Sequence, residues 1–363
     1  MNDELMVANA HKLFDADFYD RQLPWQTIGH KVNRTYKVTT AFKKAGLDYE
    51  VRLEDAAIRL PDDHGKPQWM GIPNRQQIVR YPTDFDDTFR FFGEVTPRYE
   101  ILDNMILADY IDWLISDSDW KVDTVGQLDN GQTVWVLIDM GKFSLENGEE
   151  LDNFLSFRDV KNGRTRAVAR IYTGRPFCTN VFAYGKKHGN INLEFIHRDG
   201  LHDQIDFRIK FMESVRKQLT GTQENLNRLL GHAMTDDEVV AVLNKVYKEP
   251  KRSARAALTD EYTKADVPEE LHTYFESAQR AQSTHEFFVN RTDRLRAGAM
   301  ELYKLFGVEY PGEADTAYAM FNAVAESADH RRGKTPEVVS ESSLFGTRAK
   351  EKELAFAELL KIS

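Results

Sequence analysis

The stretch "WKVDTVGQLDNGQTVWVLIDM" (residues 120–140) places two runs of strand-forming residues on either side of Asn130-Gly131. Asn-Gly suits a tight turn in which both central residues have positive φ, so the stretch predicts an antiparallel β-hairpin. The same dipeptide recurs at Asn147-Gly148 and Asn162-Gly163, and strand-like runs continue to about residue 200. Three such turns predict an antiparallel meander and argue against a parallel, doubly wound sheet.

Shorter elements are expected before this meander. The segments "YEVRLEDAAIRL" (49–60) and "QQIVRYP" (76–82) have the composition of strands. Residues 97–115 carry a broad apolar face at helical spacing, with Pro97 where a helix could begin.

The pattern becomes helical after residue 203. Residues 205–230 form one long candidate helix, and Thr235 and Glu238 stand at capping-box spacing at the start of another. Residues 269–306 form a further long helix or a pair, and the polar segment 250–270 before them is expected to be a connector. The expected fold class is therefore α+β, with an antiparallel sheet in the N-terminal half and a mainly helical C-terminal half.

These boundaries predict two domains. Residues 1–202 would form a mixed domain around the sheet, and residues 203–363 a helical region. The C-terminal helices are expected to pack back on the first domain.

The composition limits the classes of function. The 58 acidic and 48 basic residues give a net charge of −10, which argues against a globally basic nucleic-acid coat but permits a local basic groove. The one cysteine, Cys178, allows no disulfide framework and fits a reducing cytoplasm. The N-terminus has no secretory pattern, and no apolar run is long enough for a membrane span. Common nucleotide-binding, metalloprotease and hydrolase motifs are absent, so no cofactor is expected and a binding protein is favoured over an enzyme.

A local basic stretch runs from residue 158 to residue 198, where nine Lys or Arg face only Asp159 and Glu194, for a balance of +7. Aromatic residues are interleaved with these charges, as in surfaces that stack bases and follow phosphates. The alternative is ordinary strand alternation, with aromatics in the core and charges in water. The candidate nucleic-acid-binding residues are Arg158, Lys161, Arg164, Arg166, Arg170, Tyr172, Arg175, Lys186 and Lys187.

A second candidate is the polar face of "NAVAESADHRR" (322–332). On a helix, Asn322, Glu326, Asp329 and His330 fall within an arc of roughly 100°. This face is either solvated, or a buried or ligand-facing polar cluster. We expect it to be covered by a returning helix in the tail, with Arg348 as the charge partner of Asp329. One helix supplies too few ligands to complete a metal site, so no metal is expected.

Several segments together resemble the phage/plasmid-related protein family, which carries domain of unknown function 932. They are "PWQTIGHKV" (24–32), "AFKKAGLDYEV" (41–51), "GQTVWVLIDM" (131–140), "RPFCTNVF" (175–182), "TAYAMFNAVAESADHRRG" (316–333) and "SSLFGTRAKEKELA" (342–355). The resemblance implies an origin in a mobile element and hence the cytoplasm of a bacterial host cell. It implies no established activity and no catalytic residues.

Three functions are compatible with these observations. The first is binding of single-stranded DNA or RNA in support of replication or recombination, and it agrees with the basic stretch. The second is a protein-binding module that inhibits or redirects a host system. The third is a metal-dependent nucleic-acid enzyme that uses the 322–330 face. An oligomer is compatible with all three.

Overall fold

In a computed structural model of the chain, the structure describes residues 29–32, 37–61, 64–84, 86–164, 167–174, 181–183, 204–329, 331, 335, 338, 342–343 and 346–363. The chain divides into two compact units. Unit 1 comprises residues 1–223 and 333–344, and unit 2 comprises residues 224–332 and 345–363.

Unit 1 contains a six-stranded sheet in the order β1-β5-β6-β7-β8-β9, in which all neighbouring strands are antiparallel. The strands are β1 (His30–Lys31), β5 (Lys121–Leu128), β6 (Thr133–Ser144), β7 (Glu150–Val160), β8 (Val168–Gly174) and β9 (Val181–Ala183).

The predicted turns connect these strands. Asn130 and Gly131 both have positive φ, 56° and 91°, in the β5–β6 connection. Leu128 pairs with Thr133, so this connection is a four-residue loop rather than a two-residue turn. Gly148 and Gly163 also have positive φ in the next two connections. The predicted antiparallel meander is thus confirmed.

The main core lies on one face of this sheet. Val136, Ile138 and Phe157 contribute from the strands, while α2 (Val38–Lys44), α3 (Asn104–Ile115) and the first part of α4 (Gln204–Gly231) pack against them. Burying one such side chain completely stabilises the fold by about 1.5–3 kcal/mol.

The sequence pattern predicted that this helix could begin at Pro97, but helix α3 begins at Asn104. The Asp103 carboxylate accepts hydrogen bonds from the backbone N–H groups of Met105 and Ile106, at 2.7 and 3.2 Å. These bonds satisfy donors that have no partner within the first turn, and so they fix the start of the helix.

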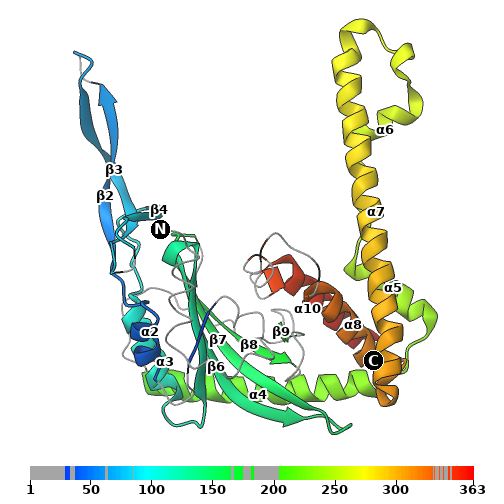
Figure 1. Cartoon of the computed structure of the whole chain (residues 1–363), viewed down its shortest axis with the longest axis horizontal. Coiled ribbons are helices and arrows are strands. Elements are labelled where there is room, and N and C mark those ends of the chain that lie inside the picture. The colour runs from blue at the N-terminus through cyan, green and yellow to red at the C-terminus, as the bar shows by residue number, and fades with distance from the viewer. Residues whose placement is uncertain are drawn as a thin grey trace. The chain divides into compact units, whose positions relative to one another are not determined.

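A second, three-stranded sheet in unit 1 has the antiparallel order β2-β3-β4, from β2 (Val51–Pro61), β3 (Pro67–Arg80) and β4 (Arg90–Val95). Strand β4 pairs only with residues 76–80 of β3, so the outer part of the β2–β3 ribbon has two strands. Figure 1 shows this ribbon extending well beyond β4. Strand β3 starts at Pro67, before the expected segment 76–82. The prediction missed residues 67–75 because their Pro and Gly weaken the strand pattern.

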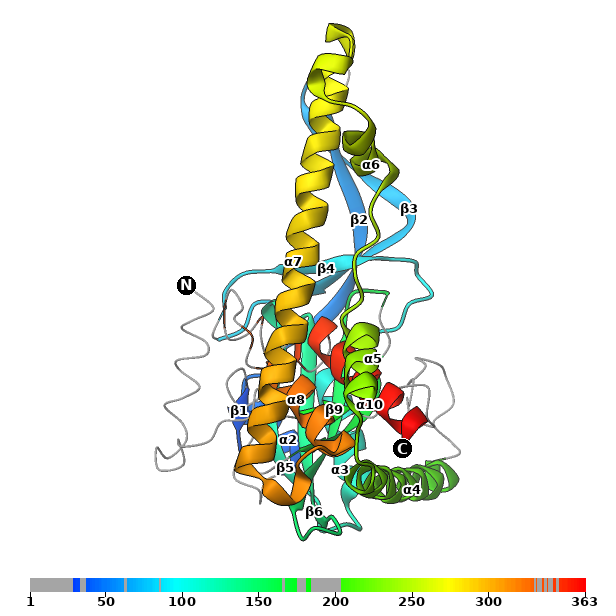
Figure 2. The same ribbon diagram turned by 90° about the vertical axis from the view of Figure 1, so that its right-hand side faces the viewer.

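Unit 2 is helical and contains α5 (Asp236–Val246), α6 (Ala254–Glu261), α7 (His272–Glu309), α8 (Ala317–Asp329) and α10 (Thr347–Ile362). Both bonds of the predicted capping box are present at α5. Figure 2 shows α7 as one uninterrupted helix with α6 alongside it. Helix α6 lies within the segment expected to be only a connector, and it is capped by Ser253.

Helix α10 packs on α8 and α5, within unit 2. That the C-terminal helices also pack on the first domain stays a prediction. The predicted α+β class is confirmed, with antiparallel sheets first and helices after them. Among the described residues, no helix combines the length and apolar character required to cross a membrane.

Candidate functional site

The register of β7 and β8 decides which residues of the basic stretch share a face. Arg158 pairs with Val168, and Ser156 pairs with Arg170. Because side chains alternate along a strand, Arg158, Arg170 and Tyr172 all lie on the face opposite the main core. Arg158 and Arg170 are diagonal neighbours, about 7–8 Å apart at their Cα atoms. The sheet therefore brings two half-buried cations together.

Tyr172 shares this face but is not available to a ligand in the structure. Its side chain is only 1% exposed, and Phe154, its partner in the strand register, is also buried. The expectation that Tyr172 stacks on a base needs correction, because its ring is part of the packing of the sheet.

Lys161 is a second correction among the candidate residues. Its ammonium lies 2.6 Å from the Asp159 carboxylate, and both side chains are buried. Two charges in this environment are compatible with folding only as a pair, so Lys161 neutralises Asp159 and is not presented to a phosphate.

Arg164 differs from Lys161 because its side chain is exposed. It follows the β7 strand, where its backbone N–H donates to the Asn162 side chain at 2.9 Å. The other basic candidates, Arg166, Arg175, Lys186 and Lys187, lie outside the described residues. Arg158, Arg164 and Arg170 are therefore the described cations of the stretch that remain as candidates.

The polar face of α8 is largely covered, as expected. Asn322 and Asp329 are buried, Glu326 is half-buried, and His330 lies outside the described residues. The Asn322 side-chain amide donates to the Tyr318 carbonyl, at 3.0 Å, within its own helix.

Asp329 is paired across the helices, but with a different residue from the one expected. The Lys352 ammonium lies 2.8 and 3.0 Å from the two carboxylate oxygens of Asp329, and both side chains are buried. Arg348 instead donates to the main-chain carbonyl of Asp329, at 3.1 Å. Arg348 and Lys352 are one turn apart on α10, so both reach the end of α8.

The pKa of Arg348 is lowered, chiefly by burial and next by the nearby cation of Arg331, while Asp329 and Glu351 oppose the change. These contacts give the α8–α10 cluster a structural role. Among the residues that the structure describes, no group of three His, Cys, Asp or Glu could hold a metal ion.

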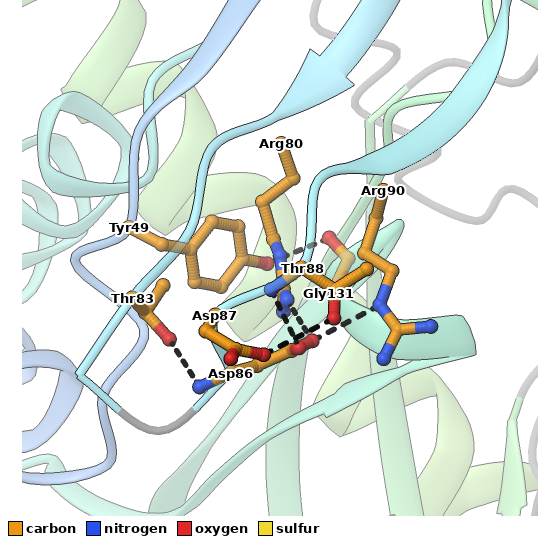
Figure 3. Close-up of polar contacts among 8 residues, drawn as sticks. All are labelled: Tyr49, Arg80, Thr83, Asp86, Asp87, Thr88, Arg90 and Gly131. Carbon is orange, nitrogen blue, oxygen red and sulfur yellow. Dashed lines mark hydrogen bonds and ion pairs between the residues drawn. The ribbon is translucent and has the colours of Figure 1, made fainter. Parts of the chain in front are cut away.

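Sequence reasoning missed a polar cluster at the base of the three-stranded sheet (Figure 3). Arg80 is buried and hydrogen-bonded to Asp86, and the Arg90 guanidinium lies 3.0 Å from the same carboxylate. The Arg80 guanidinium lies 5.5 Å from the ring centroid of Tyr49, whose hydroxyl donates to the Gly131 carbonyl at 2.6 Å. The cluster thus ties the small sheet to the β5–β6 connection.

Burial alone would raise the pKa of Asp86. Hydrogen bonds from Arg90, the Thr88 backbone and Arg80 outweigh burial and lower that pKa to about 2, from an ordinary value of 3.8. A carboxylate with a lowered pKa in the folded state stabilises the fold above its ordinary pKa and loses this contribution as the pH falls.

We therefore expect Asp86→Asn to destabilise unit 1 near neutral pH, and the difference from wild type to shrink as the pH falls from about 4 to about 2. Urea unfolding at a series of pH values measures this. Asp87→Asn, at an exposed neighbour, is the matched control. A difference between wild type and Asp86→Asn that is constant across this range would contradict the assignment.

The three-stranded sheet also exposes aromatic side chains. Trp69, Phe89 and Phe91 are 73%, 58% and 62% exposed. Phe89 makes an edge contact with Tyr81, and the Arg52 guanidinium lies over the Tyr81 ring. Large exposed aromatics of this kind are typical of protein-binding surfaces. The sequence signal for this surface is the aromatic-rich segment at residues 89–92.

The comparisons with known proteins give one match. The model of the family described as Domain of unknown function (DUF932) matches residues 92–358. No curated protein and no solved structure matches the chain. The match spans both units and confirms the resemblance to domain of unknown function 932. Because it covers well over half of the sequence, the chain belongs to the DUF932 family.

Proposed function

We propose that the protein binds single-stranded DNA or RNA, in support of replication or recombination, through the sheet face that carries Arg158 and Arg170. The observation that carries this proposal is the strand register, which makes these two arginines diagonal neighbours. A polyanion that runs along this face would contact both guanidinium groups.

Arg164 extends this set at the β7–β8 connection, where its side chain is exposed. Guanidinium groups form planar, bidentate contacts with phosphate. Two of them on the sheet face and one in the adjoining β7–β8 connection suit the backbone of a single strand. Since Tyr172 is buried, the phosphates rather than the bases are the main contact in this proposal.

Replacing Arg158, Arg164 and Arg170 together with glutamine is expected to weaken binding of a labelled single-stranded oligonucleotide at low salt by at least about tenfold. Fluorescence anisotropy of the oligonucleotide measures this. A protein with the exposed residues Arg228, Arg255 and Arg280 of unit 2 changed to glutamine has the same loss of charge and serves as the control.

The control variant should keep the wild-type affinity. Equal losses in the two variants would mean that net charge, and not this face, governs the affinity. No detectable binding by the wild-type protein at low salt would end the proposal.

The exposed aromatics of the three-stranded sheet favour a second candidate function, a module that binds a host protein. Trp69, on the outer part of the β2–β3 ribbon, and Phe91, on β4, would be two separate anchors, because aromatic residues dominate the energy of protein interfaces. A partner retained from nuclease-treated lysate by the wild type, and lost with Trp69→Asp, would favour this function. Retention that disappears with nuclease would favour the first.

A further inference from the structure

Helix α7 has two apolar faces. On one face, Phe275, Ala278, Ala299 and Tyr303 are buried within unit 2. At about 100° per residue, a second set falls within an arc of roughly 100° on another side of the helix. We call this set the α7 stripe; it comprises Phe287, Phe288, Leu295, Gly298, Leu302 and Leu305.

Three large side chains of the α7 stripe are open to solvent in the structure, while Leu295 and Leu302 are half-buried. Phe287, Phe288 and Leu305 are 56%, 43% and 50% exposed. A helix buries one apolar face when it packs on its own domain, and a second apolar face favours a further partner.

Gly298 is an independent sign that another backbone approaches here. A Cβ built at Gly298 would meet no atom within 4 Å, so no contact in the structure requires glycine. Glycine is nevertheless a poor residue for the interior of a helix, and it is useful where a second chain comes close. Gly221 of α4 also has open space around it, but its neighbours one turn away, Lys217 and Glu224, are charged.

Two charges select the orientation of a partner helix: Arg291, which lies within the arc of the α7 stripe, and Glu301, which lies just outside it. Consider two antiparallel α7 helices related by a twofold axis between Leu295 and Gly298. A residue of one helix then faces the residue of the other whose number, added to its own, gives about 593. Arg291 and Glu301 add up to 592, so each lies about 1.5 Å along the axis from a position opposite the other. In a parallel pair, Arg291 would face Arg291.

Most of the apolar residues fit the same centre, whereas Leu302 lies opposite Arg291. Leu295 of one copy lies opposite Gly298 of the other, where the missing side chain leaves room for it. Phe288 lies opposite Leu305 in this arrangement. Each copy presents the same surface to the other, as a twofold interface requires.

We propose that the α7 stripe is a self-association surface, through which two copies of this chain pair as antiparallel α7 helices about a twofold axis between Leu295 and Gly298. The partner is thus a second copy. Its recognition combines apolar packing with the Arg291–Glu301 charge pairs.

Sedimentation of the full chain tests association. The wild type should dimerise with a dissociation constant below about 100 µM, and Leu295→Glu should weaken the dimer at least about a hundredfold. Gly298→Ala should weaken it at least about tenfold, while the matched control Gly221→Ala leaves it unchanged. A wild type that remains monomeric at about 100 µM, or a dimer that Leu295→Glu leaves intact, would overturn the proposal.

Charge exchange and cysteine crosslinking test the orientation. Arg291→Glu should weaken the dimer, and Arg291→Glu with Glu301→Arg should restore it. In a chain with Cys178→Ser, Leu295→Cys should crosslink to itself. Leu305→Cys should not, because its copy lies about 26 Å away along the axis. Leu305→Cys mixed with Phe288→Cys should crosslink. Self-crosslinking of Leu305→Cys, or failure of the charge exchange to restore the dimer, would overturn the antiparallel arrangement.

Discussion

Replacing Asp329 with asparagine is expected to lower the free energy of unfolding of unit 2 by about 3–5 kcal/mol. The change leaves the Lys352 ammonium buried without its carboxylate, whose oxygens lie at 2.8 and 3.0 Å in the native protein. Arg348 does not compensate, because it contacts the main-chain carbonyl of Asp329 and carries the same charge as Lys352. Urea unfolding monitored by circular dichroism measures the loss.

Two variants make this result specific. Asp329→Leu combined with Lys352→Met removes both charges and should recover most of the lost stability. Glu351→Gln breaks the Arg331–Glu351 pair, whose side chains are 19% and 20% exposed, and should destabilise unit 2 less than Asp329→Asn does. An unchanged stability of Asp329→Asn, together with lost binding, would make the α8 face a functional site and contradict its structural role.

The second large effect is expected at Lys161. Replacing it with methionine leaves the Asp159 carboxylate buried and unpaired, and should destabilise unit 1 by about 3–5 kcal/mol. The remaining folded protein should bind an oligonucleotide with wild-type affinity, because Lys161 is buried and does not face a ligand. Urea unfolding measures the first quantity, and anisotropy at a temperature where the variant is folded measures the second.

Arg164→Gln provides the opposite pattern as a control. Its side chain is exposed, so the stability should change by no more than about 0.5 kcal/mol while binding weakens. A Lys161→Met protein of normal stability and reduced affinity would mean that Lys161 binds the nucleic acid, as the sequence predicted, and would contradict its structural role.

Local features of this fold could be predicted from the sequence, whereas the buried ion pairs could not. The Asn-Gly turns were predictable because positive φ is a local property, and Asn130, Gly131, Gly148 and Gly163 all have it. The burial of Lys161 could not be predicted, because it depends on packing between residues that are far apart in the sequence. Asp159 lies close enough to Tyr49 and Tyr99 to raise the pKa of both, although burial is the main cause for each.

The α8–α10 cluster shows an intermediate case. The apolar residues of the tail indicated a helix that returns across α8, and Lys352 of α10 does contact Asp329. The choice of Lys352 over Arg348 depends on how the helices approach each other, since the two residues share a face of α10. The Asp86 cluster could have been found, because Arg80, Asp86 and Arg90 lie within eleven residues of sequence.

The salt dependence of oligonucleotide affinity tests the central proposal most directly. Each phosphate contact to a single strand contributes about 0.7 to the slope of the logarithm of affinity against the logarithm of salt concentration. The wild-type protein should bind single strands with a steep negative slope. Glutamine at Arg158, Arg164 and Arg170 should reduce the magnitude of that slope by about 2. An identical slope in wild type and variant would contradict the proposal that this sheet face binds nucleic acid.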